Sequence, residues 1–172
     1  TRRYVDELEG TGVRLLDTRK TLPGQRHLEK YAVRVGGGSN HRMNLAEMLM
    51  LKDNHIDAAG SIAAAVSALR ACYAPCPPIE VECRTAREVG EAVAARPERI
   101  LLDNMDAGRL SEVLPLIPRS IEAEISGGVS LANIRELALA CPVRPADFIS
   151  VGRITHSAPV ADFSMKMERR AG

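Results

Sequence analysis

The sequence predicts an α/β fold built on a parallel sheet. Short apolar runs rich in Val, Ile and Leu, the composition of strands that are buried on both faces, alternate with stretches of helical periodicity. Strands and helices that alternate in this way are typical of parallel sheets with crossover helices. The chain has 172 residues, 45% of them hydrophobic, which suits one domain with a full core. These patterns leave both an open doubly wound sheet and a barrel as alternatives.

Six apolar runs are the strand candidates, and each is short enough for a buried parallel strand. Neither G-x-G-x-x-G nor G-x-x-x-x-G-K-S/T occurs, which disfavours a dinucleotide-binding sheet or a P-loop. In chain order the predicted strands are Val13–Leu16, Met48–Leu51, Ile79–Val81, Ile100–Leu102, Ile121–Glu124 and Phe148–Val151.

Helical patterns separate these runs. The first helix is predicted to end at the glycines 36–38. Thr85 and Glu88 form the pattern of a capping box in a helix that Pro97 ends, and Ser130 is the expected cap of the last one. The predicted core faces are Leu28, Tyr31, Ala32 and Val35; Ile62, Val66 and Leu69; Val89, Ala92 and Val93; Leu110, Val113, Leu114 and Ile117; and Leu131, Ile134, Leu137 and Cys141.

Composition argues against several classes of protein. The net charge is +1, aromatic residues make up 3% and Trp is absent, so we expect no nucleic-acid partner and no membrane partner. No apolar run approaches the about 18 residues of a membrane span, and no signal peptide is visible. The four cysteines lack C-x-x-C spacing and predict reduced thiols in a cytoplasmic protein. Because the chain starts at Thr1 without Met, we expect it to be part of a longer protein.

Charged residues follow most of the predicted strands. In a barrel the carboxyl ends of all strands share one rim, where active sites form, so these charges predict a convergent polar site. The alternative is that each is merely the first solvated residue of a loop. The residues at the ends are Asp17, Lys52, Glu82, Asp103, Glu124 and Gly152.

The charges of this rim are divided by sign. Cations come from the early part of the chain and anions from the middle, which suits an anionic substrate beside a Mg²⁺-bound polyphosphate. Ser126, Gly127 and Gly128 lie between a strand and a helix, where backbone N–H groups can approach a phosphate. The charged residues are Arg19, Lys20, His41, Arg42 and Lys52, then Glu82 and Asp103.

The stretch Asp17–Ile56 resembles the quinolinate phosphoribosyltransferase family. It contains DTRKTLPG, EKYAV, GGGSNHR and KDNH, and together these motifs are highly specific. Further matches follow in family order, so the resemblance covers essentially the whole chain. They are IEVE at Ile79–Glu82, LLDN at Leu101–Asn104, EISGG at Glu124–Gly128 and VGRITHS at Val151–Ser157.

The resemblance implies an incomplete, open TIM-like α/β barrel of about six to seven parallel strands that spans residues 1–172. The implied activity joins quinolinate and phosphoribosyl pyrophosphate, with Mg²⁺ as cofactor, and yields nicotinate mononucleotide, pyrophosphate and CO₂ for NAD synthesis. A homodimer or a dimer-based hexamer is the implied assembly. The family also has an N-terminal α/β sandwich domain, absent here, which donates an arginine to the neighbouring subunit's site. We therefore expect this chain alone to be weakly active or inactive.

The resemblance also implies roles for individual residues. Arg19, His41, Arg42 and Lys52 would hold the two quinolinate carboxylates. Lys20, Glu82 and Asp103 would be catalytic, the two acids also meeting the metal through water. Arg153 departs from the small residue that usually follows the Val-Gly pair. The residues implied for phosphoribosyl pyrophosphate are Thr18, Lys20, Glu82, Asp103, Ser126, Gly127, Gly128, Gly152, Arg153 and His156.

Three alternatives remain at the level of sequence. A related phosphoribosyltransferase found among molybdate-transport genes shares parts of the barrel, because a fold alone does not fix the substrate. A lyase could use Lys52 as a Schiff-base nucleophile at a strand end. A non-catalytic barrel could bind a nucleotide or a partner. For His41, a hydrogen bond to a carboxylate is favoured over proton transfer.

Overall fold

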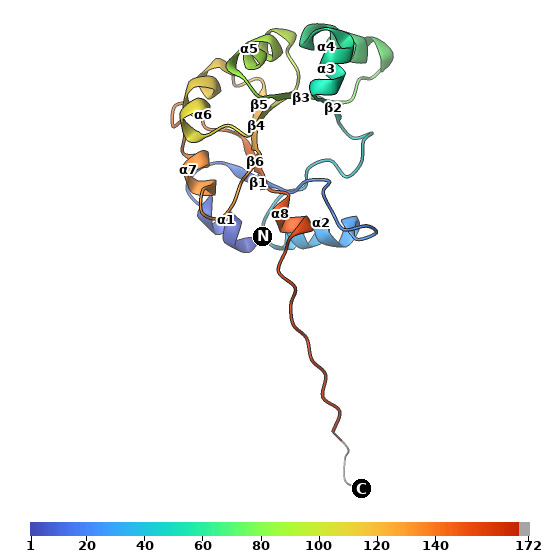
Figure 1. The fold of residues 1–172 in the computed structure, drawn as a ribbon, viewed down its shortest axis with the longest axis vertical. Coiled ribbons are helices and arrows are strands. Elements are labelled where there is room, and N and C mark those ends of the chain that lie inside the picture. Colours follow the sequence, from blue (N-terminus) through green and yellow to red (C-terminus); the bar gives the residue numbers. More distant parts are fainter. Residues whose placement is uncertain (169–172) are drawn as a thin grey trace.

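In the computed structural model, which describes residues 1–168, six parallel strands form one open sheet surrounded by helices (Figure 1). The strand order is β1-β6-β5-β4-β3-β2, so β1 and β2 are the two edges and the barrel is incomplete. The predicted fold is confirmed, with six strands in the part described. The strands are β1 (Arg14–Leu16), β2 (Leu49–Leu51), β3 (Ile79–Cys83), β4 (Arg99–Asp103), β5 (Glu122–Ser126) and β6 (Phe148–Ser150).

The helices follow the strands around the outside of the sheet (Figure 1). Apolar residues such as Ile62, Val89 and Leu110 are completely buried, so these predicted core faces are confirmed. None of the described helices is both long and apolar enough to cross a membrane. The helices are α1 (Arg2–Glu7), α2 (Arg26–Val35), α3 (Asp53–Ala59), α4 (Ile62–Cys72), α5 (Ala86–Ala95), α6 (Ala107–Val113), the 3₁₀ turn η1 (Leu114–Leu116), α7 (Ile134–Ala138) and α8 (Arg153–His156).

All six predicted strands are present, with boundaries shifted by a few residues. β3, β4 and β5 occupy the middle of the sheet, and each extends one or more residues beyond the apolar run that predicted it. These extensions add charged residues such as Glu82 and Asp103, because a barrel interior can hold polar side chains at the strand ends.

The open side of the barrel lies between β1 and β2. Residues 36–48 cross this side without forming a helix or a named strand (Figure 1). Ser39 forms a single parallel bridge with Leu16, and its N–H donates to the carbonyl of Leu15 at 2.8 Å. The guanidinium of Arg42 reaches the other edge, where it donates to the carbonyl of Met48 at 2.6 Å. Hydrogen bonds thus connect this segment to β1 on one side and to the start of β2 on the other.

The predicted core face of α2 is wrong. Leu28, Tyr31 and Val35 are 67%, 59% and 70% exposed, whereas Lys30 and Val33 are buried. The Lys30 ammonium donates to Asp17 Oδ1 at 2.5 Å and to the carbonyl of His41 at 2.8 Å. A buried charge needs such partners, and a periodicity of apolar residues cannot reveal them.

Asp17, which its place after a strand predicted to be part of the charged rim, does not line the cavity at the strand ends. It is fully buried and also accepts from the side chain of Asn40 at 2.6 Å and the backbone N–H of His41 at 2.8 Å. Asp17 therefore fixes the segment after α2 against β1.

The predicted cap of α7 is also wrong. The helix begins at Ile134, and the side chain of Asn133 accepts hydrogen bonds from the N–H and the hydroxyl of Ser130. A turn over residues 131–133 therefore separates Ser130 from the helix, while the capping box of Thr85 and Glu88 at α5 is confirmed.

Candidate functional site

A cavity of about 570 Å³ opens at the carboxyl ends of the strands. The structure brings most of the predicted site residues to its wall, from elements that are far apart in the sequence. Met50 and Leu101 add apolar surface. The predicted residues that line the cavity are Thr18, Arg19, Lys20, His41, Arg42, Lys52, Glu82, Asp103, Ser126, Gly127 and Gly128.

Two arginines approach one another at one end of the cavity. Burial lowers the pKa of Arg42, and the nearby charge of Arg19 lowers it further. The Nε of Arg19 is buried without a hydrogen-bond partner among the described residues. Two neighbouring guanidinium groups, one with a buried N–H that has no acceptor, indicate an anion-binding site.

Lys52 and Glu82, which the sequence assigned to different ligands, form an ion pair with each other. The N–H of Lys52 also donates to Nδ1 of His55 at 3.0 Å at the start of α3. His55 thus helps to hold the backbone of this loop in place. In this structure the charge of Lys52 is balanced from within the protein, so Arg19, Lys20 and Arg42 provide the excess positive charge of the wall.

The loop after β5 is built around Gly127. This residue has φ +88°, and a Cβ here would lie 2.4 Å from Oδ1 of Asn104, so only glycine fits. Asn104 itself has φ 54°, and it donates its backbone N–H to the carbonyl of Ser126 and its amide to Asp103 at 2.9 Å each. The close packing presents the backbone of residues 126–128 to the cavity beside the Asp103 carboxylate.

Three predicted site residues do not line the cavity: Gly152, Arg153 and His156. Gly152 and His156 stand directly behind Thr18, because a Cβ on Gly152 would lie 3.3 Å from Oγ1 of Thr18 and 3.1 Å from Nε2 of His156. Arg153 is exposed.

A threonine that received no role from the sequence ties α8 to the cavity wall. The hydroxyl of Thr155 donates to the carbonyl of Lys20 at 2.6 Å and lies 2.8 Å from that of Gly152. Thr155 lies in the VGRITHS motif, and this position was the one feature of the sequence that could have indicated its role.

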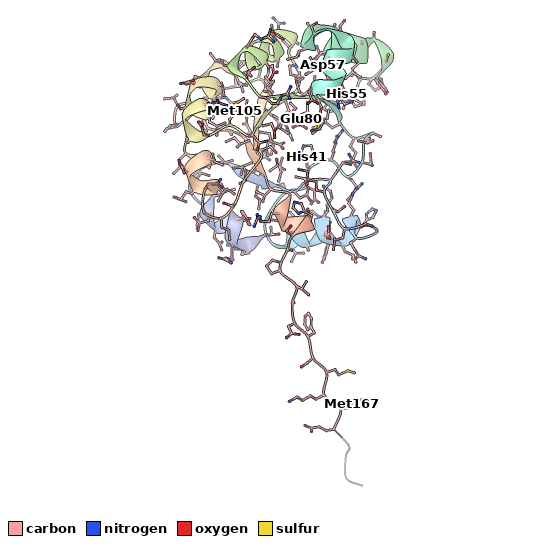
Figure 2. All side chains as sticks on the ribbon, in the orientation of Figure 1. His41, His55, Asp57, Glu80, Met105 and Met167 are labelled. Carbon is pink, nitrogen blue, oxygen red and sulfur yellow. The ribbon has the colours of Figure 1, made fainter. Side chains whose placement is uncertain are left out.

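The floor of the cavity contains a second set of charged residues, defined here as the buried layer: His41, Glu80, Arg99 and Glu124. His41 and Glu124 also line the cavity, whereas Glu80 and Arg99 lie behind them. Nε2 of His41 lies 3.1 Å from Oε2 of Glu80 and 3.4 Å from Oε2 of Glu124, and Arg99 donates to Glu124 at 3.0 Å. His41 and Glu80 lie near the centre of the ring of helices (Figure 2). No role was predicted for Glu80 or Arg99, although the alternation of Glu80 and Glu82 along β3 places both on the inner face.

Ionisation in this layer reflects burial and close neighbours. Burial and the charge of Glu124 raise the pKa of Glu80. Burial alone would also raise the pKa of Glu124, but His41 and Arg99 lower it overall. Burial lowers the pKa of His41, and the carboxylates of Glu124 and Glu80 act in the opposite direction.

Two groups of residues at the cavity contain side chains that could bind a metal ion. Among the described residues, His41, Glu80 and Glu124 have ligand atoms within 4.8 Å of one another. The predicted metal residues, Glu82 and Asp103, lie instead on the wall of the open cavity. Carboxylate oxygens that face an open cavity suit Mg²⁺, which keeps several waters.

Comparison with known proteins identifies relatives of this chain. Residues 1–166 match the family described as "Quinolinate phosphoribosyl transferase, C-terminal domain". A probable nicotinate-nucleotide pyrophosphorylase (carboxylating) from Synechocystis is 44% identical over 98% of the chain, and the enzyme of that name from Mycobacterium leprae is 41% identical over 95%. The crystal structure of NadC from Streptococcus pyogenes has 43% identity and a TM-score of 0.86 over 96% of the chain.

The chain spans only part of these proteins, covering 57% of the length of each. A nicotinate-nucleotide pyrophosphorylase from Pyrococcus furiosus, at 16% identity and a TM-score of 0.62, shares the fold. The similarity therefore concerns the C-terminal domain of these proteins.

Proposed function

We propose, because this chain belongs to the quinolinate phosphoribosyltransferase family as its C-terminal domain, that it carries the catalytic site of that enzyme. The reaction transfers phosphoribosyl from phosphoribosyl pyrophosphate to quinolinate with decarboxylation, giving nicotinate mononucleotide, pyrophosphate and CO₂ in NAD biosynthesis. The observation that carries the proposal is the pair of neighbouring guanidiniums, Arg19 and Arg42, with a buried donor unused.

Quinolinate has two carboxylates on a flat aromatic ring, and the cavity has cationic groups for the carboxylates and an apolar surface for the ring. Arg19 and Arg42 bind its carboxylates, since guanidinium groups match carboxylates in charge and in forked geometry. Met50 and Leu101 give the pyridine ring an apolar surface. Lys52 joins the carboxylate set when its ion pair with Glu82 opens.

Phosphoribosyl pyrophosphate occupies the other side of the cavity. The backbone of residues 126–128 approaches the 5′-phosphate, with Gly152 and His156 behind Thr18. Lys20 faces the pyrophosphate, and Glu82 and Asp103 face the ribose. Arg153 remains the least secure member of this set, because its side chain is exposed at the first turn of α8.

Mg²⁺ fits the acidic part of this wall. Glu82 and Asp103 supply carboxylate oxygens at an open cavity, and they would hold the ion through water. The bound ion would neutralise charge on the pyrophosphate.

The residues then act mainly by positioning. The pyridine nitrogen attacks C1 of the ribose as the bond to pyrophosphate breaks, through a transition state with oxocarbenium character. Orientation of two bound anions can supply about 7–11 kcal/mol in favourable cases. Glu82 and Asp103 stabilise the cationic ribose, and Lys20 stabilises the departing charge. The pyridinium then accepts the electrons left at C2 as CO₂ departs, and a proton replaces it.

We further propose assembly as a homodimer or a dimer-based hexamer in the cytoplasm. The exposed apolar residues Leu28, Tyr31 and Val35 on α2 support a protein contact. Two plant relatives, from Arabidopsis thaliana and Oryza sativa, are named as chloroplastic enzymes. The remaining length of the relatives predicts that further protein completes the active site, so the chain alone is expected to turn over slowly or not at all.

The test is to incubate the chain with quinolinate, phosphoribosyl pyrophosphate and Mg²⁺ and to measure nicotinate mononucleotide by mass spectrometry. The binding of each substrate to the chain is measured separately. Binding of both, with little product, is the expected result, and Asp103→Asn should abolish any product. Failure to bind either substrate would contradict the proposal. A lyase needs an uncharged Lys52, which here pairs with Glu82; covalent trapping of a carbonyl compound by borohydride would favour that alternative.

A further inference from the structure

The buried layer has polar atoms that the proposed reaction does not use. Nε2 of His41, both carboxylate oxygens of Glu80 and Oε1 of Glu124 are buried without an aligned hydrogen bond among the described residues. Buried polar groups in this state need an explanation, because each loses its interaction with water. Protons held by the carboxyl groups and the imidazole would explain how these atoms remain buried.

The backbone of Arg42 fixes which nitrogen of His41 carries a proton. Its N–H donates to Nδ1 of His41 at 2.7 Å, so Nδ1 carries a lone pair and Nε2 carries the hydrogen. The Nε2–H then lies close to the Oε2 atoms of Glu80 and Glu124, which are 3.1 and 3.4 Å from Nε2. A protonated Nε2 cannot bind a metal ion, so this tautomer excludes the metal-like geometry of the cluster as a metal site.

The charges of the layer place a second proton on Glu80. With His41 neutral, Glu80 and Glu124 would bring two negative charges into the layer, where Arg99 is the paired cation. The charge of Arg42 also acts on Glu80, but its guanidinium donates to the carbonyl of Met48 instead. Glu124 accepts from Arg99, whereas neither oxygen of Glu80 has an aligned donor. Burial favours the neutral form of a carboxyl group with no cationic donor. Glu80 is therefore the acid that stays protonated.

The neighbours of this cluster are largely paired within the protein. The backbone N–H of His41 donates to Asp17 and its carbonyl accepts from Lys30, and Asp17 and Lys30 form an ion pair with each other. Arg99 also pairs with Glu122 at 2.7 Å, and Ser150 lowers the pKa of Glu124. Arg42 follows His41 in the chain, with Arg19 beside it.

We propose that Glu80 and Glu124 are positioning residues of the quinolinate site: they hold His41 as the single tautomer whose Nδ1 fixes the Arg42 backbone, and so they place the Arg42 guanidinium. This inference rests on the proposed function for the identity of the ligand. The arrangement of the cluster itself can be tested without any ligand.

The role of Glu80 can be separated from its mere presence by two substitutions. Glu80→Gln keeps a neutral acceptor for Nε2–H, whereas Glu80→Leu removes it. The first change should leave the His41 tautomer as it is, and the second should release it.

The first experiment is NMR of the ¹⁵N-labelled chain, in which the ring nitrogens report the tautomer of each histidine from pH 6 to 9. His41 should show an unprotonated Nδ1 and a protonated Nε2 throughout, and the exposed His27 serves as the internal control. A doubly protonated His41, or one that exchanges between tautomers, would overturn the proposal, and so would stoichiometric zinc in the purified chain.

The second experiment compares Glu80→Gln with Glu80→Leu. The Gln variant should keep the His41 tautomer and the Arg42 amide signal, whereas the Leu variant should lose both. Quinolinate binding to the Leu variant should fall by about tenfold or more, the scale of losing a hydrogen bond that involves a charged group. If Leu unfolds the chain, the NMR results of the wild type and of the Gln variant still decide. A changed His41 tautomer in the Gln variant would contradict the role of Glu80.

If no form of the chain binds quinolinate but the NMR results hold, the proposed ligand is wrong and the assignment of the cluster stands. If quinolinate binds and His41 has the other tautomer, the proposed function stands and this inference fails.

Discussion

The cavity wall and the buried layer beneath it use the same kinds of side chain for different purposes. On the wall, Arg19 and Lys20 face open space, and Arg19 keeps a donor unused. In the buried layer, Arg99 and Glu124 are paired within the protein. The difference shows that charge alone does not identify a ligand-binding residue. What matters is whether the protein already supplies the partner.

The largest expected effect on stability separates a buried cation from one on the wall. Lys30→Met should lower the free energy of unfolding by about 3–5 kcal/mol, because it leaves the Asp17 carboxylate buried without its partner. Lys20→Met, at an exposed position, is the matched control and should change it by no more than about 0.5 kcal/mol. Urea unfolding measures both, and equal effects would remove the distinction between the two regions.

A smaller effect is expected from the backbone of the wall. Gly127→Ala should cost about 2–3 kcal/mol, since it combines an unfavourable φ with a collision against Asn104. Gly128→Ala, with φ +61° and a nearest approach of 3.9 Å, should cost about 1 kcal/mol. In both thermal unfolding and binding of phosphoribosyl pyrophosphate, the Gly127 variant should be the more impaired of the two. A greater loss in the Gly128 variant would show that the contact of residue 127 with Asn104 does not matter.

Thr155→Val should reduce stability by about 1 kcal/mol by removing the hydroxyl that joins α8 to Lys20. The same change should weaken binding of phosphoribosyl pyrophosphate more than that of quinolinate, because Lys20 faces the pyrophosphate. Thr155→Ser retains the hydroxyl and should recover most of the loss. A uniform loss for both substrates would argue for a general structural effect.

The smallest effect concerns two cysteines. Burial, followed by the charges of Glu88 and Glu82, raises the pKa of Cys83 to about 12, whereas Cys72 is exposed. A thiol reagent at pH 8 should modify Cys72 in the folded chain and Cys83 only after unfolding. Because the pKa of Cys83 is raised on folding, its contribution to stability is complete below about pH 9 and is lost as pH rises toward 12. Rapid modification of Cys83 in the folded chain would show that the core opens there.

The strands and the wall could be predicted from the sequence because both follow local patterns. Apolar runs located β3, β4 and β5, and the charges after them located Glu82 and Asp103. The buried layer could not be predicted in the same way. Glu80 and Arg99 lie within strands, and their meaning depends on neighbours supplied by other strands.

The orientation of α2 was missed for a related reason. An apolar stripe predicts the buried face of a helix only when no stronger interaction orients the helix. In α2 the buried ion pair between Lys30 and Asp17 places the opposite face inward. The exposed stripe that results is what an interface in a larger assembly would cover.

The most direct measurement is a calorimetric titration of quinolinate into the wild-type chain and into Arg42→Ala, with nicotinate as the ligand that lacks one carboxylate. Wild type should bind quinolinate more tightly than nicotinate, and Arg42→Ala should lose about tenfold or more in quinolinate affinity, the scale of a charge-assisted hydrogen bond. Equal affinity in the two proteins, or no binding by wild type, would contradict the claim that these residues form a dicarboxylate site.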